Sequence, residues 1–133
     1  MIRSLLATSL SCLLLLCALS SCRFMARGID LPLPQEEAGV QLNVREMTRL
    51  TTKATGVLGT VFNGSGEAVA CRLRFEAIGE WAEHLAWART GTARIEPGQT
   101  WSFNARFDRP NVRRVGSILL EDFVVEPAEP KKP

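Results

Sequence analysis

Few side chains in this sequence could do chemistry, and they do not form a recognisable catalytic set. His84 is the only histidine. A transition-metal site would therefore need carboxylates to complete it, and a catalytic serine or cysteine would have this one imidazole as its base. Cys71 lies between Val69 and Leu73 in an alternating apolar pattern. That position favours a small core residue with a raised pKa over a nucleophile.

The sequence also contains one pair of adjacent carboxylates and one short glycine-rich segment. Glu121 and Asp122 would point to opposite faces of a regular strand, so they are not expected to share a proton. Gly64-Ser65-Gly66 is too short for a phosphate-binding loop, and no lysine follows it. We therefore expect no enzyme activity, no catalytic or metal-binding residues, no cofactor and no small-molecule substrate. The alternative, a hydrolase or a metal-handling protein, would need a cleft that joins His84 to two or more carboxylates.

A different kind of chemistry is indicated near the N-terminus. An apolar stretch follows Arg3 and ends at Leu19-Ser20-Ser21-Cys22. It is shorter than the roughly 20 residues that a membrane-spanning helix needs. The pattern resembles the lipobox of bacterial lipoprotein precursors, and Cys12 and Cys17 do not fit it. The resemblance implies that residues 1–21 are a signal peptide and that Cys22 is lipidated.

This resemblance also implies a location. A protein with several acyl chains is held stably on a membrane, so we expect a lipid-anchored protein of the bacterial cell envelope. Arg23 follows the cysteine, where an aspartate often signals retention in the inner membrane, and its presence favours the outer membrane in a Gram-negative cell. The alternatives are an ordinary secretory signal and an uncleaved anchor.

The remaining chain suits one small domain. Residues 22–39 contain Leu31-Pro32-Leu33-Pro34 and are predicted to form an extended tether. Residues 40–125 form the domain, and the proline-rich residues 126–133 are predicted to be a disordered tail. The formal net charge of the whole chain is only +2, which argues against a nucleic-acid partner. Once Cys22 is lipidated, Cys71 has no partner for an intrachain disulfide.

Alternating apolar and polar residues predict that the domain is all-β. The clearest strand runs from Val69 to Phe75, and similar patterns cover Val40–Val44, Val57–Asn63 and Trp101–Phe107. Turns are predicted at 63–66, with positive φ angles, and at 96–99. Residues 80–89 contain good helix formers but also alternate, and we predict a strand there. The last strand should cover 113–125, with a bulge at Gly116. Six to seven strands of this kind predict a small β-sandwich.

Three of these segments carry a family resemblance. They read Val57-x-Gly59-x-Val61-x-Asn63, then Val69-x-Cys71-x-Leu73-x-Phe75, then Ile95-x-Pro97-Gly98-x-Thr100-x-x-Phe103. Together they resemble the FxLYD family of small immunoglobulin-like sandwiches from bacterial envelope proteins. The chain departs from the family after Phe75, where Glu76-Ala77-Ile78-Gly79 replaces the aromatic residue and aspartate. The resemblance implies an immunoglobulin-like fold and transfers no functional residue.

Two groups of residues are candidates for binding a partner. Arg72 and Arg74 should face outward on one strand and Arg106 outward on another, which would make a basic strip. Of the three tryptophans, Trp87 is expected in the core and Trp81 at the surface, where it could anchor a partner. We therefore expect a non-catalytic binding or assembly module with an envelope protein as partner. The alternative is a purely structural lipoprotein without a specific partner.

Overall fold

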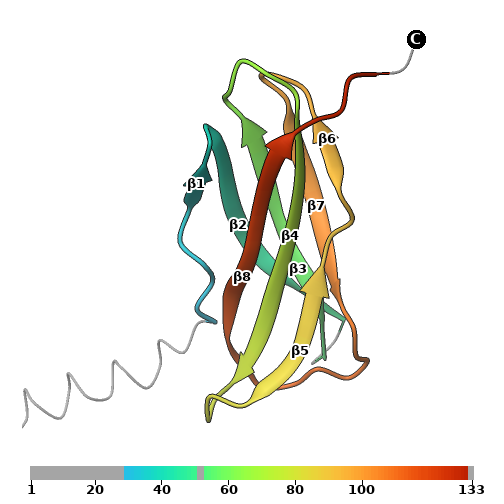
Figure 1. Cartoon of the computed structure of the whole chain (residues 1–133). Helices are drawn as coiled ribbons and strands as arrows, with labels where there is room; N and C mark the ends of the chain where they lie inside the picture. Colours follow the sequence, from blue (N-terminus) through green and yellow to red (C-terminus); the bar gives the residue numbers. More distant parts are fainter. Residues whose placement is uncertain (1–28, 51–52, 132–133) are drawn as a thin grey trace, which may run out of the picture.

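The computed structural model describes residues 29–50 and 53–131, and the described chain is all-β (Figure 1). The predicted signal peptide, Cys22 and the first part of the predicted tether lie outside these residues. Within them, no helix has the length and apolar character needed to cross a membrane. The strands are β1 (Gln35–Glu37), β2 (Val40–Leu50), β3 (Lys53–Asn63), β4 (Val69–Gly79), β5 (His84–Arg89), β6 (Ala93–Ile95), β7 (Thr100–Phe107) and β8 (Val115–Pro127).

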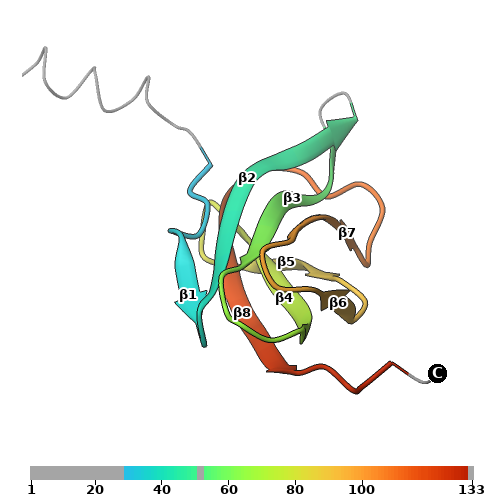
Figure 2. The ribbon, with the colours of Figure 1, turned by 90° about the horizontal axis from the view of Figure 1, so that it is seen from above.

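The strands form one curled antiparallel sheet. Its order is β1-β2-β3-β7-β5-β4-β6, and β8 pairs with β4. Seen from above, the curl brings β4 and β8 opposite β2 and β3 (Figure 2). The joint between β5 and β7 consists of only two residue pairs, Ala88 with Phe107 and Arg89 with Arg106. The long strand β4 is central, because it pairs with β5 and β6 as well as with β8.

The core lies inside the curl, and the alternating patterns predicted its composition. Along β4, Leu73 and Phe75 are buried while Arg72 is exposed. The ring of Phe75 stacks on that of Phe103 from β7, with 5.8 Å between their centroids. Val69 joins them, and Phe107 packs at the margin of the same cluster. The predicted register of β4 and β7 is therefore confirmed.

The ambiguous segment 80–89 does contain a strand, which is β5. The prediction that Trp87 lies in the core is wrong. Trp87 pairs with Glu76 of β4, so its side chain is on the outer face, where it is half-buried. Ala86 and Ala88 point inward instead and are fully buried. Their small side chains suit this position, because β5 turns here to meet β7 and leaves little space inside the curl.

Two bulges shape β8, and the sequence indicated one of them. Ser117 pairs with Ile78 while Val115 pairs with Gly79, so the predicted bulge at Gly116 is confirmed. A second irregularity lies near Glu121, because Arg74 pairs with Asp122 but the next residue of β4 pairs with Leu120. The extra residue rotates the side chains that follow it relative to those that precede it.

The segments predicted as tether and tail pack against the domain as far as they are described. Residues 35–37 form β1 on the edge of β2, and Leu31 packs against the core. The tether interpretation is therefore wrong for residues 29–39, because the unpaired edge of β2 offers hydrogen bonds and the core offers an apolar surface. At the other end, Ala128 N donates to Ala68 O at 3.0 Å, and Lys131 lies 3.1 Å from Glu96. The predicted disorder does not extend over residues 126–131.

The structure confirms the predicted turn at 96–99 and corrects the one at 63–66. Gly98 has a φ of 75°, and Gln99 N donates to Glu96 O at 3.0 Å, as expected for the turn at 96–99. The turn at 63–66 has no positive φ angle, which corrects the prediction. The buried side chain of Asn63 closes it instead, since its Oδ1 accepts hydrogen bonds from Ser65 N and Oγ at 3.0 and 2.6 Å. An Asx-type closure removes the need for a left-handed glycine.

Candidate binding surface on the outer face of the sheet

Three arginines lie side by side across the outer face of the sheet. Arg74 of β4 pairs with Arg89 of β5, and Arg89 pairs with Arg106 of β7. We call these three residues the arginine row. Like charges on directly opposed positions of neighbouring strands repel each other, so the row raises the free energy of the unliganded protein. Arg89 and Arg106 form no ion pair within the described part of the chain.

The sequence predicted two members of this row and missed the third. Arg74 and Arg106 are indeed brought together, and Arg72 lies two residues from Arg74 on the same face of β4. Arg89 supplies the link between them. Its outward position was not predicted, because Trp87 was expected in the core and Arg89 lies on the same face of β5 as Trp87.

A tryptophan and an aspartate hold Arg74 in place. Its guanidinium carbon lies 4.0 Å from the ring centroid of Trp87, which is a cation–π distance, and Asp122 lies 3.9 Å from Nη1. The indole ring also contacts the imidazole of His84, with centroids 4.8 Å apart. Nε of Arg74 is buried and has no hydrogen-bond partner in the described residues. The contact with Trp87 therefore restricts the side chain of Arg74 before any partner binds.

An open groove runs along the arginines. It has a volume of about 380 Å³ and is lined by Arg72, Arg74, Arg89 and Asp122, together with the loop from Thr90 to Thr92. The hydroxyl of Thr90 accepts a hydrogen bond from Leu73 N at 2.9 Å, which fixes the loop against β4. Guanidinium groups in this arrangement suit carboxylates, which they can bind through two parallel hydrogen bonds.

Two carboxyl groups and the histidine meet beside the groove. His84 Nδ1 lies 2.8 Å from Glu76 Oε1. The carboxyl of Glu121 shares a hydrogen bond with Glu76, and this bond, followed by desolvation, raises the pKa of Glu121. The carboxyl that interacts with Glu121 is thus Glu76 of the neighbouring strand and not the adjacent Asp122, a contact that the sequence did not predict. The bulge near Glu121 turns it toward Glu76, whereas Asp122 pairs with Arg74.

This cluster lies on an open sheet face and not in a cleft. His84 and Glu121 are exposed, and neither of them, nor Glu76, lines the groove. In the described residues, no three histidine, cysteine or acidic side chains are placed to hold a metal ion. Cys71 is fully buried, and desolvation raises the pKa of its thiol to about 11. That value fits the core role predicted for it.

The other two tryptophans lie away from the arginine row. Trp81 is 88% exposed, as expected, and lies at the tip of the hairpin between β4 and β5. Its backbone N–H donates to Glu83 Oε2 at 2.9 Å, and Ala82 has a φ of 61°, so the turn is tight. Trp101 is half-buried against Phe103, with ring centroids 5.6 Å apart. The expected partner surface of Trp81 and arginines is therefore divided into two separate regions.

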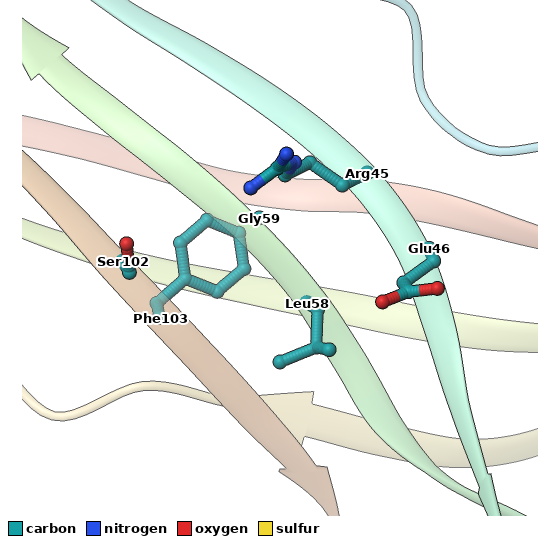
Figure 3. A pocket seen from close by; sticks show the side chains of 6 residues that line it. All are labelled: Arg45, Glu46, Leu58, Gly59, Ser102 and Phe103. Atoms are coloured by element: carbon teal, nitrogen blue, oxygen red, sulfur yellow. The ribbon is translucent and has the colours of Figure 1, made fainter.

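A further hollow lies on the side of β2, β3 and β7 (Figure 3). It has a volume of about 400 Å³ and is lined by Arg45, Glu46, Leu58, Gly59, Ser102 and Phe103. An irregularity between Val44 and Glu46 in β2 makes Arg45 the extra residue there. The side chain of Arg45 extends from β2 toward the ring of Phe103 (Figure 3). Opposite charges and an apolar ring line this hollow, without a set of polar groups that converge on one point.

Comparisons with known proteins give little further information. No protein-family model matches the chain, and no curated protein matches it in sequence. Among solved structures, the crystal structure of Bacteroides uniformis beta-glucuronidase is similar over 56% of this chain, with a TM-score of 0.40 and 17% sequence identity. The chain spans 8% of the length of that protein.

Proposed function

We propose that this protein is a lipid-anchored, non-catalytic binding module of the bacterial cell envelope, whose partner is a protein with an acidic surface. The observation that supports the binding role is the arginine row on an open, unpaired sheet face. Arg89 and Arg106 repel each other in the free protein, and a carboxylate between them would remove that repulsion. Binding would therefore be favoured by charges that are already in position.

The groove also contains features that favour a specific partner over a diffuse positive surface. Arg74 is held between Trp87 and Asp122, so little side-chain entropy is lost when it binds. Arg and Trp are the residue types most enriched at the energetic centres of protein interfaces. Leu119, which is 45% exposed on the neighbouring strand β8, adds apolar area beside them.

The anchor rests on Leu19-Ser20-Ser21-Cys22. Metabolic labelling with palmitate tests it. Label is expected in the wild type and not in Cys22→Ser, and the mature mass should lack residues 1–21. Label that persists in Cys22→Ser would refute the anchor. An inner- or outer-membrane position can then be read from the density at which the labelled protein sediments with separated membranes, where we expect the outer membrane.

Cross-linking in intact cells tests the partner. We expect wild type to capture one acidic envelope protein reproducibly, identified by mass spectrometry, and Arg89→Glu to lose it. Arg45→Glu is the matched control, because it makes the same charge change at an exposed arginine on β2, far along the sheet order. Equal capture by Arg89→Glu would contradict the proposed surface. If wild type captures nothing, a purely structural lipoprotein is the better description.

We further infer that the curled sheet is a divergent immunoglobulin-like sandwich, as the resemblance to FxLYD domains implies. The joint of only two residue pairs between β5 and β7 supports this inference. An experimental structure should then show β2, β3 and β7 in one layer facing β4, β5 and β8 in another, at roughly 30° to each other. A continuous barrel in which β5 and β7 pair along their length would contradict it.

A further inference from the structure

One end of the sheet carries the exposed Trp81 and several basic residues. Gly79, which precedes the tryptophan hairpin, pairs with Val115 at the start of β8. The loop before β8 is joined to the hairpin between β2 and β3, because Ala54 N donates to Val112 O at 2.8 Å. We call this region the basic end. At this end lie the exposed Trp81 and five cationic residues, Arg49, Lys53, Arg109, Arg113 and Arg114, together with four acidic residues, Asp30, Glu80, Glu83 and Asp108.

Three of the arginines at this end are available to a ligand. Arg49, Arg113 and Arg114 are exposed and make no ion pair with the described residues. Two of the nearby carboxylates are turned onto backbone N–H groups: Glu83 accepts from Trp81 N at 2.9 Å, and Asp108 accepts from Trp87 N at 3.0 Å.

The opposite end of the molecule has the opposite character. Its turns and the end of β8 carry mainly acidic residues, namely Glu36, Glu37, Glu67, Glu96, Glu126 and Glu129. Among the described residues near them, Arg94 and Lys131 are basic, and both contact Glu96, at 2.8 and 3.1 Å. Among the described residues, the basic end therefore carries a small excess of positive charge and the opposite end a larger excess of negative charge. An anionic surface would orient this charge distribution with the basic end toward it.

The described chain begins beside the basic end. Asp30 N donates to Gly116 O at 3.2 Å, and Gly116 adjoins Gly79 and Glu80. Cys22 is only seven residues before Ile29, which at about 3.3–3.6 Å per residue is a reach of at most about 25 Å. Whatever holds the N-terminal region on a membrane therefore keeps the basic end close to that membrane. Tryptophan is a preferred residue at the lipid–water interface.

We propose that the basic end lies on an anionic phospholipid surface, with the indole of Trp81 among the headgroups and Arg49, Arg113 and Arg114 against the lipid phosphates. This inference rests on the proposed membrane anchor for proximity, but it assigns a separate contact to the folded domain. Each cationic residue near such a surface strengthens binding by about fivefold, the equivalent of about 1 kcal/mol. The contact would also fix the direction in which the arginine row faces.

The test uses the full-length protein reconstituted into vesicles that contain brominated phosphatidylcholine, with or without phosphatidylglycerol. Bromine quenches the fluorescence of tryptophans that enter the lipid. The quenching of Trp81 alone is the difference between the quenching measured for wild type and that measured for Trp81→Phe. Because Trp81 is 88% exposed, its replacement leaves the folded core intact. We expect quenching of Trp81 in the vesicles with phosphatidylglycerol and its loss in Arg49→Glu/Arg113→Glu.

The control variant is Arg72→Glu/Arg89→Glu, which changes the net charge equally on the outer sheet face and should keep the quenching. Two results would overturn the inference: a protein that floats with the vesicles while Trp81 stays unquenched, or quenching that is equal with and without phosphatidylglycerol. A protein that does not float with either kind of vesicle would instead refute the proposed anchor. Failure of the anchor and failure of the basic end are thus distinguished.

Discussion

Gly59 of β3 lies directly against the ring of Phe103 of β7. A Cβ atom on Gly59 would lie 2.5 Å from Cζ of Phe103 and 2.5 Å from Asn43 O. The two residues are directly paired between β3 and β7, and the Phe103 ring lies where a side chain of residue 59 would project. The absence of a side chain at this position therefore lets the aromatic ring reach Phe75 and complete the core.

Replacing this glycine should destabilise the protein. We expect Gly59→Ala to lower the free energy of unfolding by about 1–3 kcal/mol, because the Phe103 ring or the β2 backbone must move. Denaturant titration measures the change. Gly91→Ala is the control, since no atom lies within 4 Å of its added Cβ, and its effect should stay within about 0.5 kcal/mol. Equal effects of the two substitutions would mean that Phe103 does not lie over Gly59.

The carboxyl pair of Glu76 and Glu121 should make stability depend on pH. The pKa of Glu121 is raised mainly by its hydrogen bond to Glu76, with further increases from desolvation and Asp122 and an opposing effect of Arg74. A carboxyl with a raised folded-state pKa holds its proton more tightly when folded. The stabilising contribution of Glu121 is therefore present at low pH. It is lost as the pH rises from the ordinary pKa of 4.5 through the raised folded-state pKa. Glu121→Gln should remove this loss of stability with rising pH.

Thermal melts of wild type and Glu121→Gln across that pH range test whether the stability changes with pH in this direction. Glu96→Gln provides a control of opposite sign, because hydrogen bonds from Arg94 and Lys131 lower the pKa of Glu96. The stabilising effect of Glu96 should be present above 4.5 and disappear as the pH falls through its lowered folded-state value. If the difference in melting temperature between wild type and Glu121→Gln is the same at every pH, the carboxyl pair does not exist in solution.

Cys71 should be unreactive while the protein is folded. Its thiol is buried and has a pKa of about 11, so at about pH 8 only a very small fraction is thiolate. We expect iodoacetamide to leave Cys71 unmodified in native protein and to alkylate it fully in denaturant, as located by peptide mass spectrometry. Rapid modification of the native protein would place Cys71 outside the core.

Strand faces could be predicted wherever the residues alternated cleanly. Val69, Leu73 and Phe75 alternate with arginines, so burial of one face fixed the register of β4. The bulge at Gly116 was also signalled, because glycine interrupts the pattern there. Trp87 was misplaced because apolar residues lie in both sets of alternating positions in β5, Leu85 and Trp87 in one and Ala86 and Ala88 in the other. The alanines entered the core since their volume fits, and local sequence does not encode that tertiary constraint.

The candidate surface was only partly predictable for the same reason. Arg74 and Arg106 were recognised from their own strands, but their connection depends on Arg89 and on which strands pair. The meeting of Glu76 with Glu121 depends on a bulge that no glycine or proline marks. Long-range pairing of this kind follows from the packing of the whole sheet. The docking of β1 on β2 was likewise hidden by the prolines that precede it.

The most direct test of the proposed binding role is site-specific photo-cross-linking in living cells. A photoreactive residue at Thr92, in the loop that lines the arginine groove, is compared with one at Thr60 in β3, which pairs with Ser102 of β7 rather than with β4 or β5. We predict a cross-link to one acidic envelope protein from position 92, its loss when Arg89→Glu is added, and no such cross-link from position 60. The same partner captured equally from both positions, or unaffected by Arg89→Glu, would contradict the assignment of the arginine row as the binding surface.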